Sequence, residues 1–226
     1  MIIIGHRGAR GLAPENTISG FNKALEYSVD EIEFDLRVTK DSAVILHHDR
    51  DIIDPNGIHR RISRHTYREL LDHKKDLVTF EEALHFLYKK VPLYIEIKPG
   101  VPTEQIIKII HKAIEKGWDH KDLRIASFSF PILQEMNQKL PEIQLIINET
   151  WSGVRASHRA SKLGITRVSM SQLWLWSGFI KAVSRGNIQL TTYTLNNPKK
   201  AKKWEKYGLY GVVTDFPDRY NHKSSD

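Results

Sequence analysis

The sequence of 226 residues contains no cysteine. Disulfide bonds and thiolate chemistry are therefore excluded, and any bound metal must have oxygen or nitrogen ligands. This absence makes clusters of carboxylates and imidazoles the candidates for a functional site.

The sequence also has no long apolar run. No stretch approaches the roughly 18 apolar residues that suggest a membrane span. Residues 1–6 show neither the basic region nor the cleavage site that mark a secretory signal. We expect a cytoplasmic protein without stable membrane insertion.

Acidic residues are fewer than basic ones. Lys and Arg total 34 against 27 Asp and Glu, which gives a formal net charge of +7 and a pI near 9.4. This excess favours anionic partners without identifying them, and it says nothing of the oligomeric state. The basic residues are not interleaved with aromatic ones and form no recognition motif, so we expect no nucleic-acid partner.

Apolar runs that suit buried strands alternate with segments whose apolar residues recur at helical spacing. The strand candidates are residues 2–4, 31–37, 93–97, 123–126, 145–147, 168–170, 190–195 and 212–214. Repeated strand and helix units imply parallel pairing, and eight of them predict one domain over residues 1–226, an α/β fold closed into a (β/α)8 TIM barrel. An open doubly wound sheet is the alternative, but its glycine-rich dinucleotide motif is missing after the first strand.

Two helix caps are predicted within this pattern. Asn16 lies just before the helical spacing that begins at Ile18. Thr79 lies before another helix and is followed by Glu82, in the spacing of a capping box. Both residues are expected to accept hydrogen bonds from helix N-termini.

The second strand candidate and the apolar segment that follows it predict a hairpin. If Asp41 and Ser42 form a two-residue loop, Asp35 lies opposite His48, with Cβ atoms about 4.5 to 5.5 Å apart. Glu33 shares a strand face with Asp35. Two carboxylates and an imidazole would then converge, although a solvated strand edge with charged side chains is the alternative.

A barrel carries its catalytic groups at the carboxyl ends of the strands. The polar residues at those positions are His6, Arg7, Glu33, Asp35, Glu96, Lys98, Ser127, Asn148, Asn196 and Asp215. Among them Glu33, Asp35 and Glu96 offer three carboxylates, which suit a hard divalent cation such as Mg²⁺ or Ca²⁺.

Basic and imidazole side chains complete this group. Arg7 and Lys98 would offset part of the negative charge and, with a metal, would form a pocket for a phosphate. His6 and His48 remain as an acid and base pair for proton transfer. A simple ion pair between Glu96 and Lys98 is the alternative for those two residues.

Short motifs follow one another in a specific order along the chain. They are Gly5-His6-Arg7-Gly8, Pro14-Glu15-Asn16-Thr17, Glu33 with Asp35, His48 with Asp49, Thr66-Tyr67-Arg68-Glu69-Leu70, Glu96 with Lys98, Ser127-Phe128, Thr194-Leu195-Asn196 and Val213-Thr214-Asp215. In combination they resemble the glycerophosphodiester phosphodiesterase family over the whole chain. The resemblance implies a TIM barrel with a small insertion after the second strand, at about residues 50–77.

The resemblance also implies roles and a reaction. The roles are metal ligation by Glu33, Asp35 and Glu96, acid and base catalysis by His6 and His48, phosphate contact by Arg7 and Lys98, and support of the site by Glu15. The implied reaction hydrolyses a small-molecule glycerophosphodiester to glycerol 3-phosphate and an alcohol, with Mg²⁺ or Ca²⁺ as cofactor. The nucleophile is either water or the neighbouring glycerol hydroxyl.

The chain departs from the family pattern at three places. Ser42 stands where the family usually has glycine, Tyr193 stands where a tryptophan is frequent, and residues 50–54 lack the usual arginine and threonine pattern. The first departure would change the hairpin turn. The other two would line the mouth of the pocket and would therefore change the substrate preference.

Two alternative functions stay open. The first is lysophospholipase D-type activity on lipid substrates, for which an apolar approach would come from Trp174, Leu175, Trp176 and Phe179. The second is a barrel that binds a phosphorylated ligand without turning it over.

Overall fold

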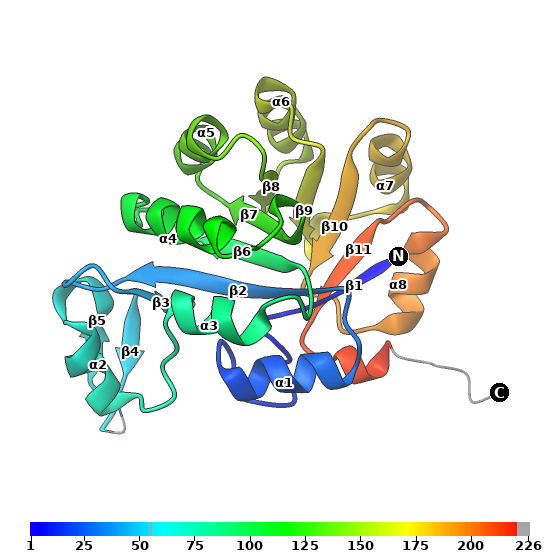
Figure 1. Ribbon diagram of the computed structural model, residues 1–226. Helices are drawn as coiled ribbons and strands as arrows, with labels where there is room; N and C mark the ends of the chain where they lie inside the picture. The colour runs from blue at the N-terminus through cyan, green and yellow to red at the C-terminus, as the bar shows by residue number, and fades with distance from the viewer. Residues whose placement is uncertain (55, 221–226) are drawn as a thin grey trace.

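A barrel of eight parallel strands forms the centre of the molecule (Figure 1). The computed structural model describes residues 1–54 and 56–220. The strands follow the order β1-β11-β10-β9-β8-β7-β6-β2, and pairing of β1 with β2 closes the barrel. They are β1 (Ile2–Gly5), β2 (Glu31–Val38), β6 (Leu93–Ile97), β7 (Leu123–Ser127), β8 (Gln144–Glu149), β9 (Arg167–Ser171), β10 (Gln189–Tyr193) and β11 (Gly211–Thr214). The predicted TIM barrel is confirmed.

Helices cover the outside of the barrel (Figure 1). They are α1 (Ile18–Glu26), α3 (Phe80–Leu87), α4 (Glu104–Glu115), α5 (Phe130–Lys139), α6 (Gly153–Leu163), α7 (Ser177–Ser184) and α8 (Pro198–Glu205), with short 3-10 segments η2 (His120–Asp122), η3 (Gln172–Trp174) and η4 (Pro217–Arg219). The capping box of Thr79 and Glu82 at α3 is confirmed. The predicted cap at Asn16 is wrong, because the side chain of Thr17 accepts the hydrogen bond from the N–H of Gly20.

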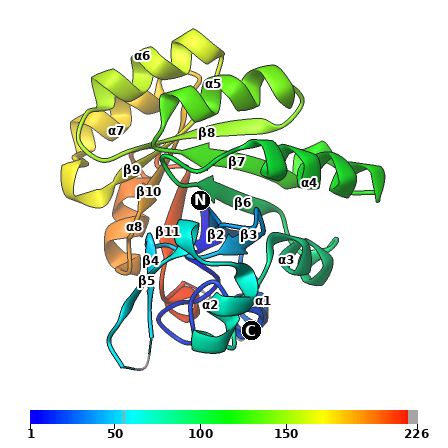
Figure 2. The ribbon, with the colours of Figure 1, turned by 90° about the vertical axis from the view of Figure 1, so that its left-hand side faces the viewer.

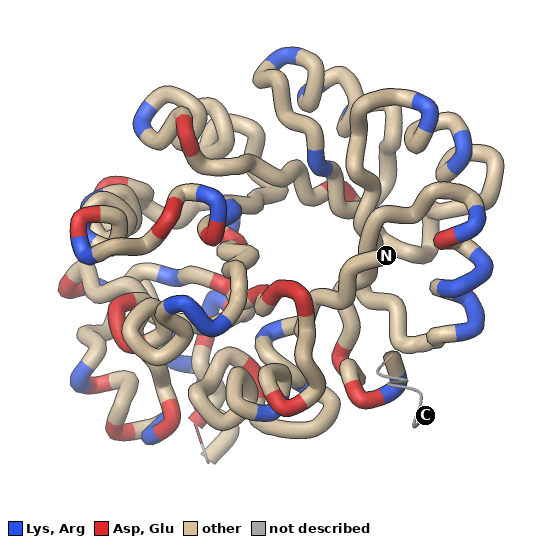
Figure 3. Tube along the Cα trace, turned by 45° about the vertical axis from the view of Figure 1, so that its right-hand side comes forward, with Lys and Arg blue, Asp and Glu red and all other residues tan. Residues whose placement is uncertain are grey.

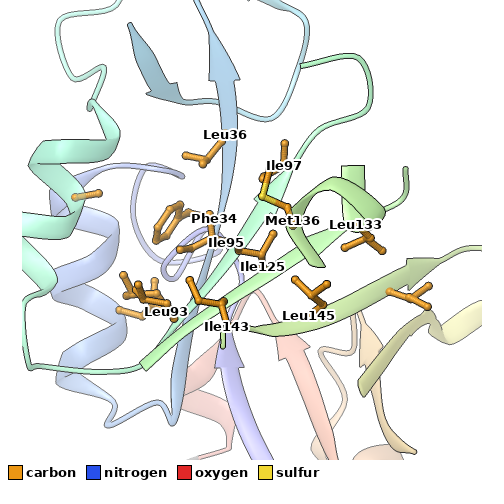
Figure 4. Close-up of a cluster of buried hydrophobic side chains, with 14 of the residues drawn as sticks. Phe34, Leu36, Leu93, Ile95, Ile97, Ile125, Leu133, Met136, Ile143 and Leu145 are labelled. Atoms are coloured by element: carbon orange, nitrogen blue, oxygen red, sulfur yellow. The ribbon is translucent and has the colours of Figure 1, made fainter. Parts of the chain in front are cut away.

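The side chains of β2 alternate between the helix layer and the barrel interior. Ile32, Phe34 and Leu36 are fully buried in the apolar shell under the helices. Figure 4 shows the last two with apolar neighbours from β6, β7 and β8. The polar side chains between them, including Glu33 and Asp35, consequently face the interior.

The amino-terminal half of the barrel interior is filled. Apolar side chains there form a cluster of Ile4, Tyr94, Ala126, Ile146 and Val213. Beside it, Arg167 donates two hydrogen bonds to Glu31, of 2.8 and 2.7 Å. This packing restricts any solvent-accessible site to the carboxyl ends of the strands.

The hairpin after β2 has a different register from the predicted one. β3 (Val44–Leu46) pairs antiparallel with the end of β2, with Val38 opposite Val44. Residues 40–42 form a three-residue loop, in which Ser42 has a φ of 66°. Such loops carry a left-handed residue at the third position, so the predicted two-residue loop is wrong by one residue.

The predicted insertion after the second strand is present. It contains β4 (Asp51–Ile53), β5 (His59–Arg61), η1 (Ile62–Arg64) and α2 (Tyr67–His73). An apolar cluster of its own holds these elements against the hairpin, and its residues are Ile45, Ile52, Ile62, Leu70 and Leu77. Figures 1 and 2 show the insertion at the carboxyl end of β2, where it stands beside the barrel mouth.

Charged residues lie mainly on the outer elements. Figure 3 shows Lys and Arg spread over the helices, with a run of them on α8, and this run comprises Lys199, Lys200, Lys202 and Lys203. Among the described residues, no helix has the length and apolarity needed to cross a bilayer.

Candidate active site

A cavity of about 180 Å³ opens at the carboxyl ends of the barrel strands. Seven residues singled out from the sequence line it: His6, Arg7, Glu33, Asp35, His48, Glu96 and Lys98. They come from the ends of β1, β2 and β6 and from the segment after β3. Closure of the barrel therefore gathers side chains that lie up to 92 positions apart in the sequence.

Three buried carboxylates converge at one wall of this cavity. Glu33 and Asp35 point inward from β2, and Glu96 lies beside Asp35 in the ladder between β2 and β6. Each contributes an oxygen atom, and these oxygens all lie within 4.8 Å of one another. The three side chains therefore have the spacing of ligands around one cation.

Two cations contact these carboxylates directly. The Arg7 Nε lies 3.2 Å from Asp35, and the Arg7 backbone N–H donates a 2.8 Å hydrogen bond to Glu33. The Lys98 Nζ lies 2.7 Å from Asp35 and donates a hydrogen bond to Glu96. The expected ion pair of Glu96 and Lys98 thus exists as part of the larger cluster.

The carboxylates differ in their affinity for protons. Burial raises the pKa of Glu33 well above its usual value, and the charges of Asp35 and Glu96 act in the same direction. Burial would also raise the pKa of Asp35, but the charges of Lys98 and Arg7 hold it well below its usual range. The two cations therefore compensate Asp35 most strongly.

These residues fit a hard divalent cation. Three carboxylate oxygens form the donor set, and the two cationic side chains that contact them carry one charge fewer in total. Mg²⁺ and Ca²⁺ prefer such oxygen ligands. The structure thus supports the predicted metal ligands as a group, without distinguishing the two ions.

Each of the two histidines has one ring nitrogen fixed by a carboxylate. The Nδ1 of His6 lies 2.6 Å from an oxygen of Asp215, and the Nδ1 of His48 lies 2.7 Å from Asp49. Because an ionised carboxylate only accepts hydrogen bonds, Nδ1 carries the proton in both rings. Nε2 is consequently the nitrogen available for proton transfer in each.

His48 reaches the cavity despite the corrected register. The backbone of His47, and not that of His48, pairs with Asp35, through a 3.0 Å hydrogen bond from its N–H. The chain leaves the ladder after Leu46, and the guanidinium of Arg37 donates hydrogen bonds of 3.2 and 2.8 Å to the carbonyl of His48. This contact holds the segment so that His48 lines the cavity.

Glu15 lies outside the cavity wall and acts on Arg7. The Arg7 Nη1 donates hydrogen bonds of 3.0 Å to both Glu15 oxygens, and Arg10 lies 3.1 Å from the same carboxylate. Glu15 thus contacts the candidate site through Arg7, and its supporting role stays a prediction.

Comparison with known proteins identifies the family. Residues 6–219 match the model of the Glycerophosphoryl diester phosphodiesterase family. The chain belongs to this family. It is accordingly a hydrolase that acts on phosphoric diesters.

Individual relatives span nearly the same length. The glycerophosphodiester phosphodiesterase of Bacillus subtilis is 27% identical over 98% of this chain and 85% of its own. The human lysophospholipase D GDPD1 is 26% identical over 96% of this chain and 83% of its own. An Oleispira antarctica phosphodiesterase structure, in complex with the product sn-glycerol-3-phosphate, superimposes with a TM-score of 0.86 at 21% identity, over 97% of this chain and 95% of that one, and so has the same fold.

Several residues of this phosphodiesterase support the site in ways that the sequence did not predict. Asn16, the expected helix cap, donates a 3.0 Å hydrogen bond to Asp35 instead. Asn148 donates a 2.9 Å hydrogen bond to Glu96 and accepts one of 2.5 Å from Tyr94. Their only signals in the sequence were a place in a family motif for Asn16 and a place at a strand end for Asn148.

Asp215 is the third such residue, and it acts on His6. Burial lowers the pKa of His6, whereas the hydrogen bond that its Nδ1 donates to Asp215 raises it. Asp215 is held in turn by a 2.9 Å hydrogen bond from Asn196. It is therefore placed to set both the orientation and the basicity of the imidazole.

We predict that Asp215→Asn lowers kcat/KM by about 10² to 10⁴, the range of a lost acid or base contribution. Loss of the carboxylate lowers the pKa of His6, so the limb of the pH profile that reports His6 should move to lower pH. A kcat/KM profile over pH measures both effects. An unchanged profile in Asp215→Asn contradicts the role of Asp215.

Proposed function

We propose that this enzyme hydrolyses small glycerophosphodiesters to glycerol 3-phosphate and an alcohol, and that it requires Mg²⁺ or Ca²⁺. The observation that carries the proposal is the convergence of three carboxylates, two cations and two imidazoles in one cavity of a family member. The Oleispira antarctica neighbour, with sn-glycerol-3-phosphate bound as product, supports this substrate class.

The carboxylates of Glu33, Asp35 and Glu96 would hold the metal ion. A bound divalent cation polarises phosphoryl oxygens and offsets charge that develops on them. Arg7 and Lys98 lie on the same wall of the cavity, where their charges favour a bound phosphate. Their ion pairs with Asp35 also keep that carboxylate ionised, as ligation requires.

His6 and His48 would move the protons. One imidazole takes a proton from the nucleophile, and the other gives a proton to the departing alcohol oxygen. Burial lowers the pKa of both rings, with Arg7 and Lys98 acting in the same direction on His6 and His48 respectively. A neutral ring with its proton on Nδ1 has an unprotonated Nε2 and can act as the base. The imidazole that acts as the acid must carry a proton on Nε2 when the alcohol leaves.

The choice of nucleophile makes the same demand on the protein. Water and the neighbouring glycerol hydroxyl both carry a proton that a base must remove. Attack by the hydroxyl would also explain a requirement for the glycerol group, because only that group carries the reacting oxygen.

Substitution of His48 tests this assignment with a matched neighbour. We predict that His48→Ala lowers turnover of glycerophosphocholine by about 10² to 10⁴, whereas His47→Ala, at the adjacent imidazole outside the cavity, leaves most activity. Glu96→Gln should likewise abolish turnover by removing a carboxylate oxygen. Choline release measures activity, and a thermal melt verifies folding.

Full activity of folded His48→Ala would contradict the two-histidine mechanism. If His47→Ala and His48→Ala lose turnover equally, the loss reflects a structural effect on the segment after β3 and not the chemistry of His48. Retained binding of a phosphorylated ligand without any turnover in the wild-type protein would favour the binding-only alternative.

An exposed aromatic patch favours a second candidate substrate class. It follows β8 and β9, on residues from the start of α6, from η3 and from the adjoining loops. It consists of Trp151, Val154, Leu173, Trp174 and Trp176, with exposed fractions of 65, 82, 83, 49 and 64%. Of the apolar approach expected from the sequence, only Trp174 and Trp176 are exposed, since Leu175 is buried and Phe179 is half-buried. Large apolar patches of this kind mark interaction sites.

The aromatic patch is connected to the cavity wall. The rings of Trp151 and Trp174 lie 5.2 Å apart. Thr150, adjacent to Trp151, lies 3.3 Å from the hydroxyl of Tyr193, which lines the cavity. The patch could therefore hold the acyl chain of a lysophospholipid, the substrate class in the name of the human relative.

Comparing glycerophosphocholine with lysophosphatidylcholine decides between these substrates. We predict higher kcat/KM on glycerophosphocholine, because the cavity itself is polar and small. If lipid turnover occurs through the aromatic patch, Leu173→Ser combined with Trp174→Ser should reduce it by roughly tenfold or more through lost apolar burial. Activity on glycerophosphocholine should stay unchanged, and higher wild-type activity on the lipid would reverse the order of the two candidates.

A further inference from the structure

A second pocket, of about 310 Å³, lies beside the active site. Three arginines, Arg37, Arg50 and Arg61, line it together with Val38, Ile62, Ser63, Pro99 and Gly100. We call it the arginine pocket. Its residues come from the end of β2, from the insertion and from the loop after β6, so it exists only where these three segments meet.

The arginine pocket adjoins the catalytic residues at two points. Arg37 follows Asp35 by two positions on the inward face of β2, a displacement of about 6.6 Å toward the barrel mouth. Its guanidinium holds the carbonyl of His48. Pro99 and Gly100 directly follow Lys98. The arginine pocket and the cavity are thus linked through the Arg37–His48 contact and through the chain after Lys98.

The charge of the arginine pocket is only partly balanced. Arg61 pairs with Asp51 at 2.6 Å. Within residues 1–54 and 56–220, however, no carboxylate lies within 4.0 Å of the guanidinium of Arg37 or of Arg50. Two guanidinium groups therefore face one pocket without a carboxylate counterion.

We propose that the arginine pocket binds a second phosphate, carried by the alcohol part of the substrate. The inference rests on the proposed function and specifies the substrate class as glycerophosphodiesters whose alcohol bears a phosphate group. Guanidinium groups pair with phosphate oxygens through two parallel hydrogen bonds. The displacement of about 6.6 Å between the levels of Asp35 and Arg37 is one that a short polyol linker can span.

Exposed arginines on a basic protein usually face solvent only. A merely solvated cluster would favour any more highly charged diester, wherever its added phosphate lies, and salt would screen this preference. Selectivity for a phosphate at the correct distance from the reacting phosphorus therefore separates a site from a charged surface.

The test compares glycerophosphoglycerol with the same diester carrying a terminal phosphate on the leaving glycerol. The wild-type enzyme should have a kcat/KM roughly tenfold or more higher on the phosphorylated diester, as expected for a charge-assisted hydrogen bond. Arg50→Gln should lower the ratio of the two kcat/KM values by a similar factor. Arg64→Gln, at an exposed arginine of the insertion outside the pocket, should leave the ratio unchanged.

Each outcome decides one question. Equal wild-type kcat/KM on the two diesters, or an unchanged ratio in Arg50→Gln, overturns the arginine pocket while leaving the proposed function standing. Lack of hydrolysis of both diesters and of glycerophosphocholine overturns the proposed function itself. Inorganic phosphate is the last arm: if it inhibits both diesters equally in the wild type and in Arg50→Gln, the phosphate acts in the cavity and not in the arginine pocket.

Discussion

Three carboxylates buried at one barrel mouth impose the constraint on which the rest of the site depends. Glu33, Asp35 and Glu96 repel one another in a region of low polarity, so their charges must be compensated. Arg7 and Lys98 supply part of that compensation, mainly at Asp35. Burial, together with the charges of its two acidic neighbours, raises the pKa of Glu33. Three oxygen donors this close together suit a divalent cation, on which the proposed function relies.

The geometry of the barrel strands places the three carboxylates together. Alternation along β2 sends Phe34 into the apolar shell and its two acidic neighbours into the interior. Parallel pairing with β6 then places Glu96 next to Asp35. Because the amino-terminal half of the interior is filled, by apolar side chains and by the pair of Arg167 and Glu31, the cavity with the candidate site residues opens at the carboxyl end. The insertion borders that end and contributes Arg50 and Arg61 to the second pocket.

Sequence patterns predicted the strands and helices more accurately than the hairpin register and the contacts of individual side chains. Eight strands could be predicted because buried apolar runs and helical spacing alternate along the chain, and their polar ends indicated the site residues. The hairpin register could not, because the left-handed conformation of Ser42 allows a three-residue loop that residue identity does not suggest. Asn16 looked like a helix cap, and only the tertiary structure brings Asp35 within its reach. Exposure of Trp151 and the meeting of three segments at the arginine pocket likewise depend on tertiary packing.

Calorimetric titration of the metal-free enzyme with Mg²⁺ and with Ca²⁺, in buffers of different ionisation enthalpy, tests the central claim most directly. The account predicts one divalent ion per chain. It also predicts that binding releases protons, because the ion competes with protons for the carboxylate oxygens and burial raises the pKa of Glu33. Absence of saturable binding by either ion, or binding that persists unchanged in Glu96→Gln, would contradict the account.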